Sequence, residues 1–416
     1  MMLITASLVI LAAYLVGSIP FGYLIARWRG VDIFLEGSGN IGATNVGRVL
    51  GRRFGILVFL LDFAKGAVPV GVARWITGAE GTAFPEDLVE VLAGLAAFLG
   101  HLFSIYLRFR GGKGVATAAG VVTVLVPVPT LGALLIWLSL LCATRYMSLA
   151  SIIAAVGLCA LRVGLTPEPF NPDHRILSLF CLVAAGLVVL RHRENVARLF
   201  HGTENRLRDA RAMLLLSKTV HVLALGLWFG STVFFSLVAT PIIFSSFGSL
   251  GANAFQERPA WLPETLDKDK ASQLAGLAVG PIFPWYFLLQ GICGVLALAA
   301  AWSWPWSLPG QTVHKVRFLV LALALATVLI GWPLAQKVSG LRTARFAADP
   351  SVASSARAEF ATWHRYSLLL NFVTMGLVAV AMALAARLPA EPSSQIEGQA
   401  LPSAEEKKTP ASPVSP

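Results

Sequence analysis

Charged side chains are scarce in this sequence: they make up 13% of its 416 residues, whereas hydrophobic residues make up 56%. Soluble proteins carry about 25% charged residues. This shortage excludes an ordinary soluble protein and indicates several apolar helices that cross a lipid bilayer. The predicted fold class is therefore all-α, a polytopic integral membrane helix bundle.

Cysteine is also rare, and no two cysteines form a C-x-x-C pair. The four cysteines all lie in apolar segments: Cys142, Cys159, Cys181 and Cys293. We interpret them as small apolar core residues, which excludes a disulfide framework and a thiolate metal site. The sequence has no evident metal cluster either, so we expect no metal and no cofactor.

Basic residues exceed acidic ones, with a formal net charge of +11. In a membrane protein this excess indicates cytoplasmic loops, anionic lipid or an anionic substrate. No aromatic-rich basic domain is present, so we do not expect a nucleic-acid partner. The first positive charge is Arg27. The first apolar run therefore lacks the basic start of a cleaved signal peptide, and we predict an uncleaved span with its N-terminus outside.

Seven apolar segments in the first half are long enough, or nearly long enough, to cross a membrane. They are 3–26, 54–76, 88–107, 115–126, 130–143, 149–165 and 176–190, with a turn at V-P-V-P-T between the fourth and fifth. With the N-terminus outside, the basic loops at 27–53, 108–114, 144–148 and 191–216 all face the cytoplasm, as the positive-inside rule requires. Asp62 and Lys65 share one helical face inside the second segment and are predicted to form an ion pair.

The second half differs in character. Four further spans are predicted at 217–244, 281–302, 316–335 and 366–387, with a long loop at 245–275. The predicted domains are 1–206, a linker at 207–216, a four-helix membrane domain at 217–388 and a disordered tail at 389–416. The linker overlaps the charged stretch 202–213, which is itself typical of a linker. One prediction conflicts with the charge rule: the loop at 336–365 would lie outside, although it carries five basic residues.

Three polar stretches lie on the predicted cytoplasmic face. The first, Gly37–Arg48, alternates four glycines with small polar residues and ends on an arginine, which is typical of an anion-binding loop. The second is G-G-K-G at Gly111–Gly114. It is not a nucleotide P-loop, because Leu107 replaces the first glycine and Gly114 replaces the Ser or Thr. The third is Arg191–Phe200, where His192 and Asn195 share one helical face.

Each stretch alone is also consistent with an ordinary loop, a positively charged membrane anchor or an interfacial histidine. Together they supply hydroxyls, amides, a lysine, arginines and a histidine at one membrane edge, a set that suits acyl or phosphoryl transfer. The alternative is a transporter for phosphate or a phosphorylated solute, which would place its polar site near mid-membrane on broken helices or repeats. We find no repeat.

Residues 1–206 resemble the PlsY family, bacterial integral-membrane acyltransferases that use acyl phosphate. The resemblance rests on G-S-I-P-F-G-Y-L-I-A (17–26), G-S-G-N-I-G-A-T-N-V-G-R (37–48), L-D-F-A-K-G (61–66), G-G-K-G-V-A-T (111–117), R-Y-M-S-L-A-S-I (145–152) and R-H-R-E-N-V-A-R-L (191–199). It implies an enzyme of the bacterial inner membrane, with seven spans and its active site facing the cytoplasm. The implied reaction takes acyl phosphate and glycerol 3-phosphate to lysophosphatidic acid and phosphate, the first acylation of phospholipid biosynthesis. A phosphotransacylase that produces acyl phosphate is an implied partner.

The resemblance also implies roles for individual residues. The implied catalytic residues are Lys113, His192, Asn195 and Ser38. The implied substrate-binding residues are Gly37, Gly39, Asn40, Thr44, Asn45, Arg48, Gly111, Gly112, Gly114, Thr117, Arg145 and Ser148. The implied mechanism is direct attack of the glycerol hydroxyl on the acyl carbonyl, without a metal. No histidine has an aspartate five positions on, so the acyltransferases that use H-x-x-x-x-D and thioester donors are not supported.

The segment 214–390 resembles an uncharacterised four-span membrane family and implies no activity. Some relatives of that family look like copper-resistance membrane proteins. Its histidines His221, His314 and His364 are candidate haem or metal ligands. The alternative, that they are packed or interfacial histidines, is the more common situation. A scaffold without catalytic function is a further alternative for this half of the chain.

Overall fold

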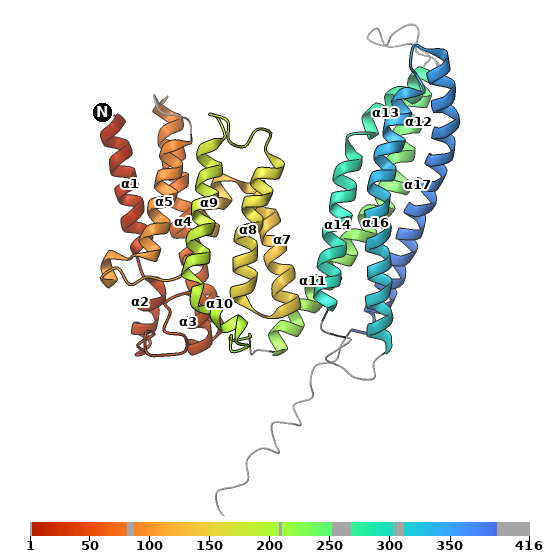
Figure 1. Cartoon of the computed structure of the whole chain (residues 1–416). Coiled ribbons are helices and arrows are strands. Elements are labelled where there is room, and N and C mark those ends of the chain that lie inside the picture. The colour runs from red at the N-terminus through yellow and green to blue at the C-terminus, as the bar shows by residue number, and fades with distance from the viewer. Residues whose placement is uncertain are drawn as a thin grey trace, which may run out of the picture. The chain divides into compact units, whose positions relative to one another are not determined.

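The structure, a computed structural model, describes residues 2–80, 87–207, 210–251, 268–302, 304 and 312–388. The chain divides into two compact units, one of Met1–Arg208 with Leu298–Trp302 and one of Asp209–Ala297 with Ser303–Pro416. Every regular element among the described residues is a helix, so the all-α prediction is confirmed (Figure 1). The predicted tail at 389–416 lies outside the described residues.

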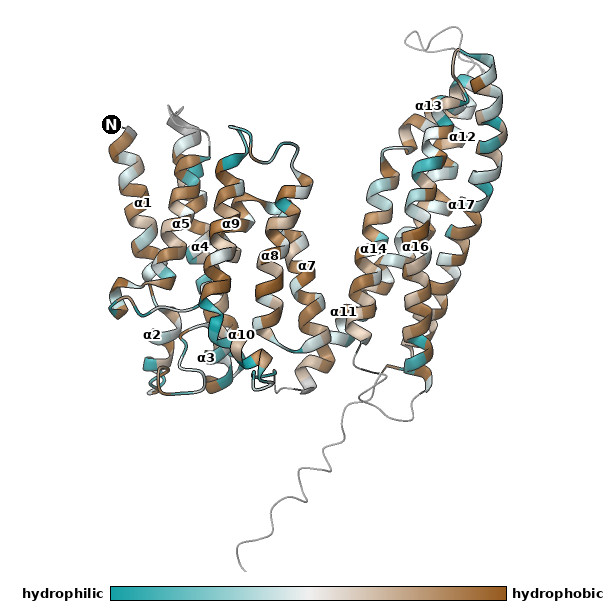
Figure 2. Ribbon diagram, in the orientation of Figure 1, coloured by the Kyte–Doolittle hydropathy of each residue, from teal (hydrophilic) through white to brown (hydrophobic). Residues whose placement is uncertain are grey.

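The described residues of the stretch Met1–Arg208 form ten α-helices and one 3₁₀ turn. They are α1 (Met2–Ser18), α2 (Phe21–Trp28), α3 (Ala43–Leu50), α4 (Arg52–Glu80), α5 (Leu88–Leu102), η1 (Ile105–Leu107), α6 (Val115–Leu125), α7 (Pro127–Thr144), α8 (Met147–Leu165), α9 (Arg175–Arg191) and α10 (Arg193–Phe200). The helices lie where the seven apolar segments are predicted. Figure 2 shows their hydrophobic residues along the middle of the unit, as expected for helices surrounded by lipid.

Three of the predicted boundaries differ in the structure, two of them because of proline. The first predicted span, 3–26, is broken between α1 and α2, where Pro20 lacks the N–H that a continuous helix needs. The predicted turn at 127–130 is instead the first turn of α7, where Pro127 costs no hydrogen bond, and the connection is Val126 alone. The predicted loop 27–53 contains α3, so it is partly helical.

Helices α4 and α6 approach closely because each contributes a glycine that lies against the backbone of the other helix. A Cβ on Gly66 would lie 2.1 Å from the carbonyl oxygen of Thr117, and one on Gly120 would lie 2.1 Å from that of Phe63. Small residues allow this close packing between membrane helices. The contact fixes the start of α6, and with it the G-G-K-G stretch that immediately precedes this helix.

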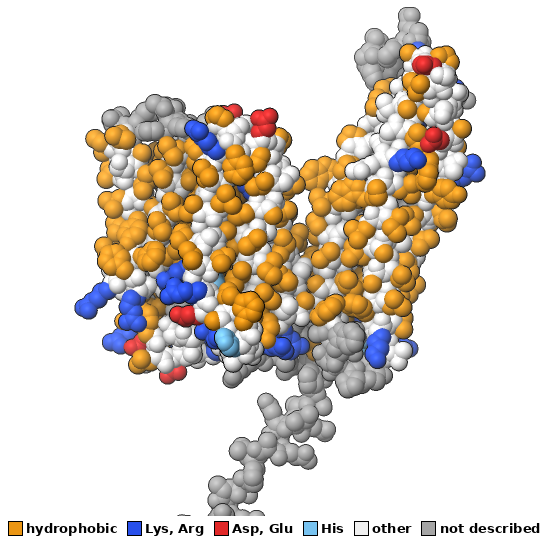
Figure 3. Space-filling view, in the orientation of Figure 1, with side chains coloured by type: hydrophobic (Ala, Val, Ile, Leu, Met, Phe, Trp, Pro, Cys, Tyr) orange, Lys and Arg blue, Asp and Glu red, His pale blue; other side chains and the backbone are white. Residues whose placement is uncertain are grey.

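The loops that carry the polar stretches meet at one end of the first unit (Figure 1). Arg110 lies over the ring of Phe34, 4.8 Å from its centroid. The Leu207 N–H donates to the carbonyl oxygen of Arg145 at 3.0 Å. Lys and Arg side chains also gather at this end in Figure 3. The structure thus groups the loops on a single face, as predicted; the side of the membrane that this face occupies stays a prediction.

The second unit contains α11 (Ala210–Val233), the π-helix η2 (Phe234–Ala239), α12 (Thr240–Gly251), α13 (Lys268–Val279), α14 (Ile282–Ala301), α16 (Thr312–Ala344) and α17 (Pro350–Ala385). The four predicted spans lie within these helices. Among the described residues of the whole chain, nine helices are long and apolar enough to cross a membrane, or ten if the bent pair α9–α10 is one span. The number that do cross stays a prediction.

Two predicted loops of this unit are wrong in part. The loop at 336–365 is mostly helical, because α16 and α17 run through it and leave only 345–349 between them. At 1.5 Å per residue, helices of 33 and 36 residues are longer than a bilayer core of about 30 Å. In the loop at 245–275, α12 continues to Gly251 and α13 begins at Lys268. Likewise, α11 begins at Ala210, inside the predicted linker 207–216.

Candidate active site

The G-G-K-G stretch is held by hydrogen bonds to its backbone. Arg191 donates from Nε and Nη2 to the carbonyl oxygens of Gly111 and Gly112, at 2.9 to 3.1 Å. The Gly112 N–H donates to the carbonyl oxygen of His101 at 3.2 Å. A Cβ on Gly112 would lie 2.4 Å from His101 Nε2, so any larger residue there would have to displace the buried His101 ring. The two glycines therefore fix the position of Lys113; whether they also touch substrate stays a prediction.

A buried charged cluster supports this stretch from inside the unit. Lys65 Nζ lies 2.8 Å from Asp62 Oδ1, which confirms the predicted ion pair, and it also donates to the carbonyl oxygen of Ile19 at 2.7 Å. His101 Nδ1 lies 3.1 Å from Thr117 Oγ1 and 3.7 Å from Asp62 Oδ1. The Thr117 hydroxyl, predicted to bind substrate, thus faces His101 in a fully buried position.

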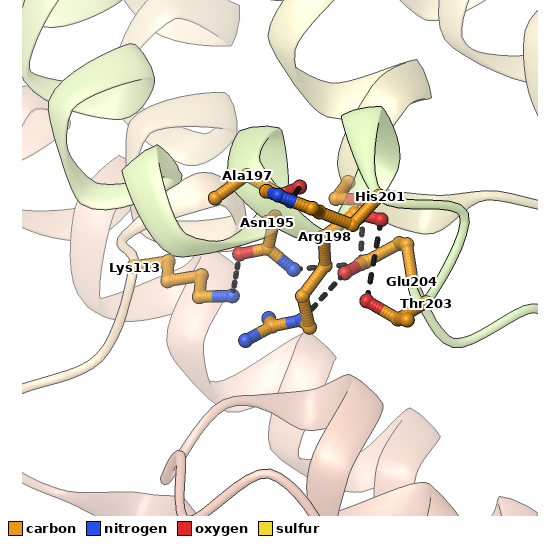
Figure 4. Close-up of polar contacts among 8 residues, drawn as sticks. Lys113, Asn195, Ala197, Arg198, His201, Thr203 and Glu204 are labelled. Carbon is orange, nitrogen blue, oxygen red and sulfur yellow. Dashed lines mark hydrogen bonds and ion pairs between the residues drawn. The ribbon is translucent and has the colours of Figure 1, made fainter.

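Lys113 points into a hydrogen-bonded chain of side chains (Figure 4). Lys113 Nζ donates to Asn195 Oδ1, and Asn195 Nδ2 donates to Glu204 Oε1 at 2.7 Å. The same Oε1 accepts from Ser148 Oγ at 2.7 Å, and Glu204 Oε2 accepts from Arg198 Nε at 2.8 Å. The structure therefore brings together three residues that the sequence singled out on separate loops, and it joins them through Glu204.

Glu204 was missed by the sequence analysis, which assigned no role to it and noted only the charged stretch 202–213 around it. The chain returns it to the site through a C-terminal cap on α10: the Thr203 N–H donates to Arg198 O at 2.9 Å and the Gly202 N–H to Leu199 O at 3.2 Å. Gly202 has a φ of +68°. This is the Schellman arrangement, in which a glycine just after a helix reverses the chain. A glycine following a helical segment was thus the available signal.

Burial and neighbouring charges shift the pKa values of Lys113 and Glu204 in this hydrogen-bonded group. Burial, together with the nearby Arg198, lowers the pKa of Lys113 to about 8, against the opposing effect of Glu204 and Glu194. Burial by itself would raise the pKa of Glu204, but the hydrogen bonds from Asn195, Ser148 and Arg198 lower it overall. At neutral pH the site therefore holds an ionised Glu204 beside a lysine that loses its charge in mildly alkaline solution.

His192 lies at the junction of α9 and α10, where the two helices differ in direction by 56°. Its side chain is 3% exposed, and Nδ1 lies 2.7 Å from the carbonyl oxygen of Val188. A carbonyl only accepts, so Nδ1 carries the proton and Nε2 is left as an acceptor. The imidazole can thus receive a hydrogen bond from a hydroxyl group.

The first polar loop is shaped by Asn45, which is buried. Its Nδ2 donates to the carbonyl oxygens of Glu36 and Asn40, each at 3.0 Å, and its Oδ1 accepts from the Ser38 N–H at 2.8 Å. Arg48 Nη1 lies 3.5 Å from the same Oδ1. The Asn45 amide is therefore committed to holding the loop. Substrate contacts of the loop residues Ser38, Gly37, Gly39, Asn40, Thr44, Asn45 and Arg48 stay predictions, as do those of Gly114 and Arg145.

The assembled site is cationic, rich in donors and contains no grouping suited to a metal. Among the described residues, no three His, Cys, Asp or Glu side chains are placed to hold a metal ion. Lys113 and Arg198 supply positive charge, and the glycine stretch supplies close backbone approach. Such an arrangement can bind a phosphate and stabilise negative charge that develops on a carbonyl oxygen.

Comparison with known proteins gives matches to each unit. Residues 7–202 match the model of the family described as "Glycerol-3-phosphate acyltransferase", and residues 223–338 match "Domain of unknown function (DUF4149)".

Individual relatives match the first unit. The "Glycerol-3-phosphate acyltransferase" of Geobacter sulfurreducens (strain ATCC 51573 / DSM 12127 / PCA) is 49% identical over 196 residues, which are 47% of this chain and 94% of that protein. Its namesake from Aquifex aeolicus (strain VF5) is 42% identical over 201 residues, 48% of this chain and 98% of that protein. A crystal structure of PlsY in its "glycerol 3-phosphate form" is 39% identical, covers 50% of this chain and 98% of that chain, and has a TM-score of 0.45.

Proposed function

We propose that the hydrogen-bonded side chains of Lys113, Asn195 and Glu204 form the site where this protein transfers an acyl group from acyl phosphate to glycerol 3-phosphate. Through its first unit the protein belongs to the glycerol-3-phosphate acyltransferase family. The observation that carries this assignment is the position of Lys113, fixed between glycines and directed at Asn195 within the matched region. The products are lysophosphatidic acid and inorganic phosphate, the first acylation of phospholipid biosynthesis.

In the proposed reaction the 1-hydroxyl oxygen of glycerol 3-phosphate attacks the acyl carbon. The bond between that carbon and the phosphate oxygen breaks, and phosphate leaves with the bonding electrons. The leaving phosphate takes the hydroxyl proton, so the protein needs no activated nucleophile. Lys113 stabilises the charge that develops on the carbonyl and phosphate oxygens. His192 Nε2 and Asn195 orient the glycerol part, and Ser38 and Arg48 contact phosphate.

The test is acyl transfer by the purified full chain with acyl phosphate, acyl-CoA or acyl carrier protein as donor. We expect lysophosphatidic acid from acyl phosphate alone, with one phosphate released for each acyl group transferred. Product from a thioester donor alone would refute the proposed donor. The transporter alternative has less support, because the residues of the proposed site gather at one end of the helices of the first unit (Figure 1). In the cell the donor would come from a phosphotransacylase, the proposed partner.

We further propose that the site faces the cytoplasm of the bacterial inner membrane. The basic loops at the site end support this orientation, because positive charge is retained on the cytoplasmic side. Single cysteines placed at Arg53 and Arg110, both exposed at this end, should be labelled by a membrane-impermeant maleimide only after the cells are opened. A cysteine in the opposite loop, at Asn171, should react in intact cells. Labelling of either site-end cysteine in intact cells would contradict the orientation.

The pH dependence of kcat/KM should follow the charge of Lys113. With its pKa lowered to about 8 in the free enzyme, the ammonium form predominates below pH 8 and is lost above it. We therefore expect kcat/KM to fall as the pH rises through about 8, since this parameter reports ionisation of the free enzyme. In Lys113→Arg, whatever activity remains should not show this decline, because a guanidinium stays charged. An unchanged alkaline decline in that variant would assign the ionisation to another group.

A fragment of residues 1–211 is expected to keep the acyltransferase activity of the full chain. All side chains of the proposed site lie before residue 205, and relatives of about half this length contain the whole matched region. Inter-domain contacts within a chain are usually modest, so a unit with its own core should fold alone. Activity is compared per mole of folded protein. A folded but inactive fragment would show that the second unit completes the site.

A further inference from the structure

The second unit contains a buried cluster that the acyltransferase reaction does not use. His221 on α11 and His314 and Arg317 on α16 surround the indole of Trp304. The Trp304 ring centroid lies 4.9 Å from that of His221 and 5.9 Å from that of His314, and the guanidinium carbon of Arg317 lies 5.3 Å from it. His221 and Arg317 are 0% exposed and His314 is 1% exposed. Polar side chains buried in a membrane unit are rare and mark candidate sites.

The hydrogen bonds within the cluster fix which atoms carry protons. Arg317 Nη1 lies 3.1 Å from His314 Nδ1. An arginine only donates, so Nδ1 accepts and the His314 proton is on Nε2. His221 Nδ1 lies 3.0 Å from the carbonyl oxygen of Ala297, so this nitrogen donates and Nε2 has a free lone pair.

Three polar atoms of the cluster remain without a partner. Arg317 Nε, His314 Nε2 and His221 Nε2 are buried and make no hydrogen bond within the described part of the chain. The first two are donors and the third is an acceptor. Buried polar groups nearly always have a partner, so each of these atoms requires an explanation.

A purely structural role accounts for only part of this arrangement. Arg317 Nη2 donates to the carbonyl oxygens of Leu384 and of Arg387, the latter at 2.9 Å, and so caps the C-terminal end of α17. Capping leaves Arg317 Nε and both imidazole Nε2 atoms unexplained. It also leaves the charge unbalanced, because none of the ion pairs among the described residues includes Arg317. A buried unpaired cation favours an anionic ligand.

A metal ion or haem iron held by histidines fits this cluster poorly. The guanidinium of Arg317 contacts the imidazole of His314 and would repel a cation, and the His314 Nε2 is protonated. The third candidate ligand, His364, is 20 residues before Leu384 on the straight run of α17, which corresponds to about 30 Å at 1.5 Å per residue. His364 instead stacks on Phe360. The structure therefore does not group the three histidines.

We propose that His221, His314 and Arg317 bind a phosphate group that keeps an ionisable proton, as a phosphate monoester or inorganic phosphate does. Its oxygens accept from Arg317 Nε and His314 Nε2, and its charge balances the guanidinium. In a monoester the ionisable proton has a pKa of about 6. This proton can lie between a phosphate oxygen and His221 Nε2, which satisfies the remaining acceptor. Sulfate and carboxylates lack such a proton at neutral pH and would leave His221 Nε2 without a donor.

The cluster lies where helix ends meet. His314 is in the first turn of α16, and Arg317 reaches the last residues of α17. Lipid headgroups occupy this level in a membrane. The phosphate group can thus belong to a lysophosphatidic-acid-type lipid, which is a monoester, or to free inorganic phosphate, two ligands that share the chemistry recognised here.

The first experiment measures phosphate bound per full-length chain by equilibrium dialysis in detergent. The number of inorganic phosphate sites should be larger by one in wild type than in His221→Phe. This additional site should not bind sulfate. Acyl transfer should be unchanged in His221→Phe, which shows that the first unit is intact. The matched control, His364→Phe, removes a histidine of the same unit outside the cluster and should keep the site.

The second experiment separates the two sources by native mass spectrometry of the same proteins. Retention of lysophosphatidic acid, but not of lysophosphatidylcholine, by wild type and its loss in His221→Phe would identify a lipid ligand. Binding of inorganic phosphate alone would identify free phosphate. Equal binding of sulfate, or the same number of phosphate sites in wild type and His221→Phe, would overturn the proposal. His314→Phe removes a donor from the other side of the cluster and should lose the same site, so the comparison with wild type can be made with this variant if His221→Phe does not fold.

Discussion

Replacement of Lys113 by alanine is expected to lower kcat for acyl transfer by about 10³-fold or more while the protein still inserts and folds. The Lys113 ammonium group donates to Asn195, and Arg191 holds the carbonyl oxygens of the two glycines that precede it. Its removal takes away a positive charge that stabilises the negative charge developing in the reaction. The side chain is partly exposed and packs no core, so stability should change little.

The measurement is initial rate with acyl phosphate, together with a melting curve for each variant. Lys113→Arg tests whether charge alone suffices, since a guanidinium keeps the charge but not the geometry of an ammonium. Arg53→Ala is the matched control, because it removes an exposed positive charge from the same end of the unit. Wild-type turnover in Lys113→Ala would remove this residue from the site, and an equal loss in Arg53→Ala would indicate a general effect of charge.

Replacement of Glu204 by alanine is expected to lower kcat/KM by about 10²-fold, although Glu204 need not touch the substrate. Its two carboxylate oxygens hold Asn195, Ser148 and Arg198 at 2.7 to 2.8 Å. Without them, Asn195 loses the partner that orients its amide toward Lys113. A small displacement of a positioned group is enough to reduce the rate by this amount.

Two further variants separate position from charge. Glu204→Gln keeps an oxygen for Asn195 and Ser148 and should lose less activity than Glu204→Ala. Glu194→Ala is the control, because Glu194 is an exposed acid on α10.

A fragment that ends at residue 202, where the family match ends, should be less active than one that ends at 211, because it lacks Glu204. Equal rates for Glu204→Ala and wild type would show that Asn195 holds its position without it.

The membrane character of this protein and most of its spans follow from the sequence, because apolar runs of the right length are a local property. The same holds for the three polar stretches, whose glycines, Lys113 and the pair of His192 and Asn195 are visible as short motifs. The spacing of Asp62 and Lys65 predicted their ion pair for the same reason: residues three apart on a helix are neighbours.

Contacts between distant segments could be decided only by the tertiary structure. Glu204 joins side chains from positions 113, 148 and 195, and no periodicity relates these positions. The commitment of the Asn45 amide to its own loop depends on how the chain turns at residues 36 to 42. In the second unit, the sequence offered three equivalent histidines, whereas packing of α11, α14 and α16 placed two of them around Trp304 beside Arg317. Hydrogen-bond partners across helices depend on rotation and depth of each helix, which the hydrophobic pattern of a membrane span does not specify.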